Sequence, residues 1–126
     1  MDIVPSENRP SLPTQFELAW PLLRVLRAAD GPMTNEAMEA AVADDINLTT
    51  EQREVKRSPR GIGSRTLLDY KLGWSRTILK NMGAIHKVAS ATWVVTDVGR
   101  QTAKADIDKY NKASLGRLEG QRRTNA

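Results

Sequence analysis

The chain has 126 residues, of which 40% are hydrophobic and 27% are charged, and its formal net charge is +4. This length and composition are typical of one small globular domain with tails. The sequence has no cysteine, which excludes disulfides and thiolate metal sites, and it contains neither a run of eighteen apolar residues nor a basic-then-apolar leader pattern. These features predict a cytoplasmic protein and argue against the secreted and membrane-spanning classes.

Charge is distributed unevenly along the sequence. Residues 1–55 carry a net charge of −6, residues 56–87 carry +7, and residues 88–126 carry +3. The middle segment has eight basic residues and a single acid, Asp69, so pairing within the segment cannot neutralise it. Such a concentration of cations is expected of a protein that binds a polyanion. A solvated surface or a contact for an acidic protein would give the same pattern.

The N-terminal part predicts an arm followed by a helix. Residues 1–13 contain three prolines and are expected to form a flexible arm. The helix should begin after this arm with Thr14 as its N-cap, and Pro21 should kink it or delay its start. Asp30-Gly31-Pro32 is a stop signal. The core-facing positions of this helix are predicted to be Phe16, Trp20, Leu23 and Leu26.

A short extended piece at Met33 leads to a second predicted helix, which Thr34 caps. Acidic residues 44–45 lie near its end, where they oppose the helix dipole, so this end is expected to fray. A short helical turn capped by Thr49 or Thr50 should follow. The small-residue packing face of the second helix is predicted to consist of Ala37, Met38, Ala41 and Val42.

Residues 57–66 are predicted to form a flexible basic loop. Gly61-Ile62-Gly63 within it has the glycine content of a phosphate-binding loop. However, no strand precedes it and no Gly-Lys-Ser/Thr follows, so the pattern argues against nucleotide binding. Its arginines are expected to face solvent or DNA phosphates.

A helix over residues 69–82 is the most informative element. One face is apolar, and it comprises Leu68, Leu72, Ser75, Leu79 and Met82. The opposite face combines cations, an amide and a hydroxyl around a glycine, and it comprises Asp69, Tyr70, Gly73, Arg76, Thr77, Lys80 and Asn81. Arginine bonds guanine edges, asparagine bonds adenine, and lysine or threonine bonds phosphate, so this face is typical of a helix that enters a DNA groove. A cationic amphipathic helix that only packs and stays soluble is the alternative.

Two strands and a last helix are predicted after Gly83. The strands lie around Ile85–Lys87 and Trp93–Val95 and are joined by Ala89-Ser90-Ala91. Thr96-Asp97 should cap the last helix, and a basic tail or linker is expected over residues 111–126. The inward positions of this helix are predicted to be Val98, Ala105 and Tyr110.

The predicted fold class is therefore mainly α with a small β-hairpin. The order helix, strand, helix, helix, hairpin, helix over residues 14–110 is that of a winged helix-turn-helix domain, in which the third helix reads the groove and the hairpin is the wing. The connection before the third helix is about twenty residues long, far longer than the roughly 3–4 residues of the usual turn.

Four sequence patterns carry a family resemblance. They are Leu22-Leu23-Arg24, Leu48-Thr49, Leu72-Gly73-Trp74-Ser75-Arg76-Thr77 with Leu79-Lys80 and Gly83, and Thr96-Asp97-Val98-Gly99-Arg100. Over roughly residues 14–106 the chain resembles the N-terminal domain of Mrr-type restriction proteins, which also have a long basic insertion before the third helix. The resemblance implies a winged-helix DNA-binding domain from a restriction or phage-defence system. In full-length relatives a nuclease domain that cleaves modified DNA follows, and these 126 residues hold no counterpart of it.

Duplex DNA is the expected partner, a homodimer is considered, and a nuclease domain could follow in the parent protein. No cofactor, catalytic residue or metal ligand is expected, and His86 is the only histidine. Arg76, Thr77, Lys80 and Asn81 are expected to face the major groove. The remaining expected DNA contacts are Arg57, Arg60, Arg65, Tyr70, Lys71, Gly73, His86 and Lys87.

Three further features of the sequence allow other interpretations. Asp69-Tyr70-Lys71 has the spacing of a nuclease half-motif, but helix capping explains Asp69 better. Trp93 is expected in the core, whereas Trp74 either borders the core or stacks on a flipped base. The whole domain could instead be a protein-interaction winged helix that dimerises through its acidic first helices and last helix, or a small transcriptional regulator.

Overall fold

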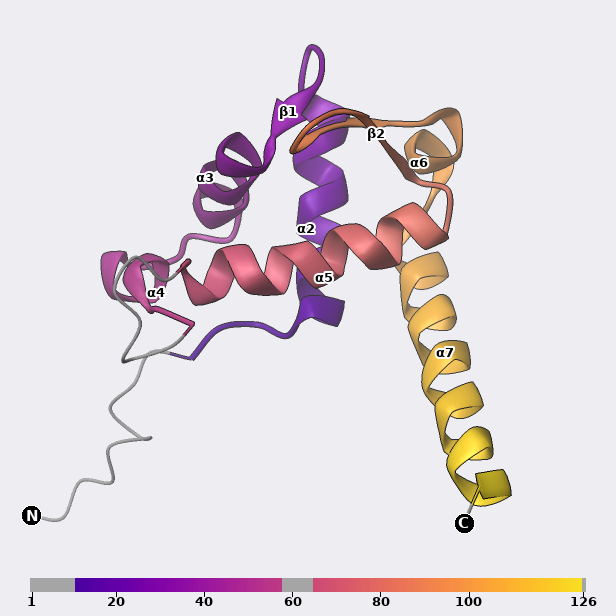
Figure 1. Cartoon of the computed structure of the whole chain (residues 1–126). Helices are drawn as coiled ribbons and strands as arrows, with labels where there is room; N and C mark the ends of the chain where they lie inside the picture. The colour runs from indigo at the N-terminus through magenta and orange to yellow at the C-terminus, as the bar shows by residue number, and fades with distance from the viewer. Residues whose placement is uncertain (1–10, 58–64, 126) are drawn as a thin grey trace, which may run out of the picture.

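The computed structural model describes residues 11–57 and 65–125, with side chains as far as Ser114. Its elements, in chain order, are α2 (Gln15–Ala28), β1 (Met33–Thr34), α3 (Asn35–Asp45), α4 (Thr50–Glu54), α5 (Leu67–Asn81), β2 (Ile85–Ala89), β3 (Thr92–Val95), α6 (Asp97–Gln101) and α7 (Lys104–Asn125). The strands form one antiparallel sheet in the order β1-β3-β2. The predicted mainly helical α+β class is confirmed, and the arrangement is winged-helix-like (Figure 1).

Five helices begin at a threonine whose hydroxyl accepts a hydrogen bond from the backbone N–H three residues later, at 3.0–3.2 Å. Such caps satisfy donors that a helix start leaves unpaired. The third predicted helix starts earlier than expected, at Leu67, and Asp69 is therefore not its cap. The caps are Thr14, Thr34, Thr49, Thr66 and Thr96.

Helix α2 is the centre of the core and packs against α3, α5 and α7. It is continuous through Pro21 and does not start late. Of the predicted core positions, Leu23 and Leu26 are buried, but Phe16 and Trp20 are only half-buried. The reason is that Phe16 and Trp20 border a groove toward α7, whereas the side of α2 facing α3 and α5 is closed. The buried residues of α2 are Leu18, Ala19, Pro21, Leu22, Leu23 and Leu26.

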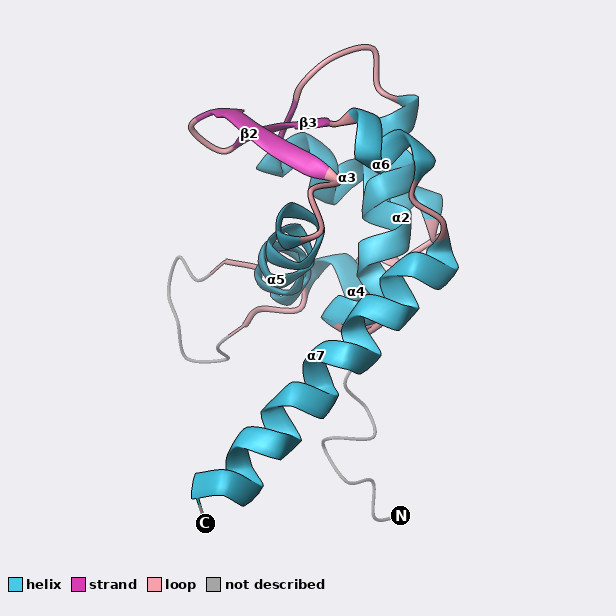
Figure 2. Cartoon of the chain, turned by 90° about the vertical axis from the view of Figure 1, so that its right-hand side faces the viewer, coloured by secondary structure: helices cyan, strands magenta, loops and turns pink. Residues whose placement is uncertain are grey.

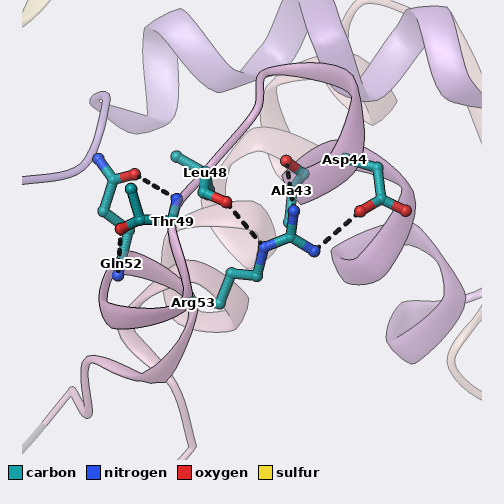
Figure 3. A network of polar contacts seen from close by, with 6 residues as sticks. All are labelled: Ala43, Asp44, Leu48, Thr49, Gln52 and Arg53. Atoms are coloured by element: carbon teal, nitrogen blue, oxygen red, sulfur yellow. Dashed lines mark hydrogen bonds and ion pairs between the residues drawn. The ribbon is translucent and has the colours of Figure 1, made fainter.

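The end of α3 is held in place and not left to fray. Arg53 of α4 donates from Nε to the Leu48 carbonyl at 3.0 Å and from Nη2 to the Ala43 carbonyl at 3.3 Å, and it forms an ion pair with Asp44 at 2.8 Å (Figure 3). Arg24 of α2 forms a second ion pair, with Asp45, at 2.5 Å. These two arginines offset the acids that the helix dipole disfavours.

The sheet places the hairpin over one end of the core. Trp93 of β3 pairs with Met33 of β1 and with Lys87 of β2, and its indole donates to the Asn35 side chain at 3.0 Å. Trp93 is buried, as predicted. The turn residue Ala91 has a φ of 51°, and the register shifts between Lys87 and Ala89. The β2–β3 hairpin projects as a wing, which Figure 2 shows at the edge of the molecule.

Helix α6 is fixed against the start of the wing at Gly99. A Cβ on Gly99 would lie 2.0 Å from the carbonyl oxygen of Ala84, so no larger residue fits without displacing backbone. The Thr96 hydroxyl accepts from the Gly99 N–H and donates to the Gly83 carbonyl at 2.5 Å. The Thr-x-x-Gly part of the resemblance is thus a packing motif that joins α6 to the wing.

The prediction of a single last helix is wrong, because the chain breaks between α6 and α7. Arg27 of α2 donates to the Gly99 and Thr102 carbonyls and draws this break toward the core. The inward positions consequently differ from the expected ones. Val98 of α6 and Ala105 of α7 are exposed, and Tyr110 of α7 is only half-buried.

Among residues 98–114 the buried positions are Gly99, Thr102, Ile107 and Asn111. Helix α7 also continues past the boundary expected at residue 110, as far as Asn125, and both views show it extending away from the rest of the domain (Figures 1 and 2). None of the helices in the described part of the chain is both long and apolar enough to span a bilayer.

Candidate nucleic-acid interface

The base of the basic loop delivers two arginines to the start of α5. The Arg57 N–H donates to the Arg65 carbonyl at 3.1 Å, and the Leu67 N–H donates to the Val55 carbonyl at 2.7 Å. A bridge between Lys56 and Thr66 lies between these bonds. The loop is therefore closed by a short antiparallel ladder, which fixes Arg57 and Arg65 next to one another. Arg60 lies outside the described residues.

Both arginines lie against Tyr70 in the first turns of α5. The Arg57 Cζ is 4.2 Å from the centre of the Tyr70 ring, and the Arg65 Cζ is 5.8 Å from it. Guanidinium groups at such distances are attracted to the face of an aromatic ring. Gly73 and the half-exposed Trp74 continue the same surface. We refer to Arg57, Arg65, Tyr70, Gly73 and Trp74 as the Arg–aromatic cluster.

The cluster changes the acidity of its phenol. The Trp74 indole N–H and then the Arg57 guanidinium, both hydrogen-bonding to the phenol oxygen, lower the pKa of Tyr70 below its ordinary value, and the positive charges of Arg57 and Arg65 act in the same direction. The phenol oxygen of Tyr70 is therefore surrounded by donors and cations. The surroundings of Tyr70 favour negative charge, which is what an anionic ligand requires.

Asp69 is the only acid of α5, and it forms an ion pair with Arg65. Its carboxylate accepts from the Arg65 Nε at 2.7 Å, and its backbone carbonyl accepts from the Arg65 Nη2 at 3.1 Å. As the third residue of the helix, Asp69 also interacts favourably with the helix dipole. A structural role thus accounts for it. Across the described residues, no three His, Asp or Glu side chains converge in a way that could hold a metal ion.

The prediction that Arg76 faces outward is wrong, because only 5% of its surface is exposed. Residue 76 lies three positions before the buried Leu79, which places the two side chains only about 60° apart around the helix. Gly73 leaves space on the preceding turn, and the Arg76 Nη2 lies 3.6 Å from the point where a Cβ of Gly73 would be. The side chain therefore folds along α5 and does not extend into solvent.

The guanidinium of Arg76 is poorly compensated. Its Nη1 is buried and has no hydrogen-bond partner within the part of the chain that the structure describes. Burial lowers the pKa of Arg76; the charges of Asp69 and Glu39 oppose this shift, and that of Arg65 reinforces it. Arginine stays protonated at neutral pH in spite of such a shift. Arg76 is thus a buried cation at the edge of the interface.

Lys71 also departs from the expected interface. Its Nζ donates to the Pro13 carbonyl at 3.0 Å and to the Leu12 carbonyl at 3.4 Å, both in the segment before α2. Residue 71 lies about 100° around the helix from Tyr70, on the side facing α2. Lys71 therefore fastens the N-terminal segment and does not lie on the outer face of α5.

The remaining predicted residues of α5 and the wing are accessible. Thr77, Lys80 and Asn81 are exposed on α5, and His86 and Lys87 are exposed on β2. Figure 2 shows α5 nearly end-on with the hairpin projecting on the same side of the molecule. These side chains could reach one ligand together.

Trp74, for which the sequence allows either the border of the core or the surface, is a surface residue with 51% of its area exposed. Its spacing of four residues from Tyr70 was the signal, because residues four apart share one helix face. Together with Arg65, Gly73 and Thr77, the two aromatic residues line a depression of about 220 Å³. Val88, at the wing, is a second exposed apolar residue that sequence reasoning did not single out.

The pattern from Leu72 to Thr77 divides into core and surface roles. Leu72 is in the core, and the buried Ser75 donates from its hydroxyl to the Gln15 carbonyl at 2.7 Å, which ties α5 to the start of α2. Trp74 and Thr77 are exposed, and Gly73 makes room for arginine side chains. The pattern therefore encodes both the docking of α5 on α2 and the composition of its outer face.

Comparison with known proteins gives one match. The family model described as the Mrr N-terminal domain matches residues 16–105, which include all elements from α2 to the start of α7. No curated protein and no solved structure matches the chain. The resemblance that the sequence patterns indicated is thus confirmed. With most of its length covered by this model, the chain belongs to the Mrr N-terminal domain family.

Proposed function

We propose that this restriction-system-associated domain binds duplex DNA, with the outer face of α5 in the major groove and the β2–β3 hairpin along the sugar-phosphate backbone. The supporting observation is the positive charge on and around α5. Arg57, Arg65, Lys80 and Lys87 lie on α5, beside it or on the wing, while the single acid of α5 is bonded to Arg65. Such a surface attracts phosphates and has little internal neutralisation.

The end of α5 supplies the groups that read bases. Asn81 can form two hydrogen bonds to adenine, and Thr77 can contact a base edge or a thymine methyl group. Lys80 can bond guanine or phosphate. Because Arg76 is buried, base recognition in this proposal rests on Thr77, Lys80 and Asn81, with His86 and Lys87 placed on the backbone by the wing.

Salt dependence tests the proposal. If four cations engage phosphates, the logarithm of the association constant should fall with the logarithm of salt concentration at a slope of about −3.6. Fluorescence anisotropy with a labelled duplex measures this slope. Lys80→Ala should make the slope shallower by about 1, whereas Lys109→Ala on α7 should leave it unchanged. A slope near zero, or equal effects of the two variants, would contradict the proposal.

The proposal assigns this domain recognition and not cleavage, in a restriction or phage-defence setting. It is supported by the family match, which is to the N-terminal domain of Mrr. Incubation of the domain with plasmid DNA and Mg²⁺ should leave the plasmid supercoiled. Nicking that persists in a protein purified by an independent route would contradict this part of the proposal.

Homodimerisation is a second candidate function, favoured by one observation. A groove of about 800 Å³ lies between α2 and the first half of α7, and half-buried Phe16 and Trp20 line it. Helix α7 extends beyond this groove, so a second copy could place its own α7 there (Figure 1). Light scattering should then show a dimer that Trp20→Glu dissociates. A monomer at high concentration would remove this candidate.

A further inference from the structure

We propose that buried Arg76 and the Arg–aromatic cluster form a pocket for one phosphate group. The inference rests on the proposed DNA binding for the source of that phosphate, namely the DNA backbone. The chemistry of the pocket does not depend on the source, because a free phosphate ion presents the same oxygens. The experiments below therefore test the two sources separately.

The pocket is an open depression on the outer face of α5. Arg65, Tyr70, Gly73, Trp74 and Thr77 line a depression of about 220 Å³, which is several times the roughly 30 Å³ that one water molecule takes up. It opens on the same outer face of α5 that carries the groups proposed to read DNA. A phosphate group with part of its sugar can enter such a space.

Two guanidinium groups lie next to Gly73: that of Arg65 lines the depression, and that of Arg76 is buried beside it. The Arg65 Nη2 and the Arg76 Nη2 lie 3.5 Å and 3.6 Å from the position that a Cβ of Gly73 would occupy. They approach this point from the loop base and from the next turn of α5. Arginine pairs suit phosphate because each planar guanidinium presents N–H donors in a fixed geometry. Gly73 keeps the space between them open.

The charge balance of the site leaves one positive charge without compensation. Arg57, Arg65 and Arg76 are opposed by Asp69 and Glu39, of which Asp69 is bonded to Arg65 and Glu39 accepts from the Thr66 hydroxyl. Neither acid bonds Arg76 in the described part of the chain, and its Nη1 is orphaned at 5% residue exposure. Burying a cation without a partner costs free energy. A phosphodiester carries the one negative charge that would compensate it.

Thermal unfolding in inorganic phosphate tests the pocket directly, with chloride used to hold ionic strength constant. A ligand that binds only the folded state raises the melting temperature. The wild-type domain should gain several degrees at saturating phosphate, and Arg76→Met should lose this gain. In phosphate-free buffer Arg76→Met should melt at or above the wild-type temperature, because an apolar side chain replaces an unpaired buried cation. Arg100→Met, at an exposed position, is the matched control.

Gly73→Ala provides a second variant that is expected to fold. A Cβ at 3.5–3.6 Å from two flexible side-chain ends is in ordinary contact, and alanine is favoured over glycine inside a helix. The variant should therefore be at least as stable as wild type. It should nevertheless bind phosphate about tenfold more weakly, because the methyl group occupies part of the depression.

The same variants, titrated with a labelled duplex, test whether the DNA backbone supplies the phosphate. Arg76→Met and Gly73→Ala should each make the salt slope shallower by about 1, with Arg100→Met unchanged. If phosphate stabilises the domain through Arg76 but no duplex is bound, the pocket stands and the DNA function fails. If the duplex is bound with its full slope by both variants and phosphate shifts no melting temperature, the pocket is overturned while DNA binding stands.

Discussion

Gly99 shows how strongly a single position can constrain this fold. We predict that Gly99→Ala lowers the free energy of unfolding by about 1–3 kcal/mol or more, because the new Cβ would lie 2.0 Å from the Ala84 carbonyl oxygen and 2.7 Å from a Val95 methyl carbon. Urea denaturation measures the change. Gly31→Ala is the control, since nothing lies within 4 Å of a Cβ there. Equal stability of the two variants would mean that α6 does not pack closely against Ala84 and Val95.

Tyr70 should titrate at a lower pH than an ordinary tyrosine. Hydrogen bonds from Trp74 and then Arg57 lower its pKa, so tyrosinate absorbance should appear earlier in the folded protein than in urea. Tyr70→Phe should remove this early transition. Trp74→Phe, which keeps a ring but loses the N–H, should move the pKa back toward about 10. An unchanged titration in Trp74→Phe would contradict the hydrogen bond.

The sign of the linked stability follows from the direction of that shift. Because the folded state favours the ionised phenol, ionised Tyr70 stabilises the fold above the unfolded-state pKa of about 10. This contribution is lost as the pH falls through the lower pKa of the folded state. The stability difference between wild type and Tyr70→Phe should therefore increase on the alkaline side.

Residue positions on α5 were predictable where they lay near the middle of a face. Leu72 and Leu79 are buried and Lys80 and Asn81 are exposed, as helix periodicity indicates. Arg76 and Lys71 lie at the margins between the faces, where periodicity does not decide. Gly73 and the carbonyls of Leu12 and Pro13 determine their positions, and those contacts depend on the tertiary structure.

At the scale of elements, Arg53 joins α3 to α4 more than any other side chain of that junction (Figure 3). We predict that Arg53→Met lowers the free energy of unfolding by about 1–3 kcal/mol, because the Leu48 carbonyl loses the Arg53 donor and the Ala43 carbonyl keeps only the Leu48 N–H. Asp44→Asn removes only an exposed ion pair and should cost less than about 1 kcal/mol. Denaturant titrations of both variants measure the two losses of unfolding free energy. Equal losses would mean that the ion pair, and not the carbonyl bonds, holds the junction.

Helix starts could be predicted from the sequence, and helix ends less well. Threonine caps act locally, within three residues, so the caps at Thr14, Thr34 and Thr96 were found from sequence alone. The break between α6 and α7 was missed because Arg27, more than seventy residues away in sequence, holds the Gly99 and Thr102 carbonyls. Such a bond leaves no local pattern.

At the scale of the whole molecule, the uneven charge of the sequence becomes an uneven surface. Two acids of the N-terminal segment, Asp44 and Asp45, are paired with Arg53 and Arg24 within that segment. The cations of the middle segment that the structure describes lie on α5, at the loop base and on the wing, and Asp69 is the one acid of α5. The region of the domain that carries the basic residues was therefore predictable from the sequence, whereas the positions of the individual side chains depend on the fold.

A pair of charge-reversed variants tests this orientation independently of net charge. Lys80→Glu with Lys87→Glu changes the interface, and Arg100→Glu with Lys109→Glu changes α6 and α7; each pair takes the formal net charge from +4 to 0, because every reversal removes two units. Long-range attraction to DNA is thus weakened alike in both. Only the first pair loses phosphate contacts, so its salt slope should be shallower by about 2, while the second keeps the wild-type slope. Anisotropy titrations at several salt concentrations give both slopes. If the second pair loses as much slope as the first, DNA contacts a different face of the domain.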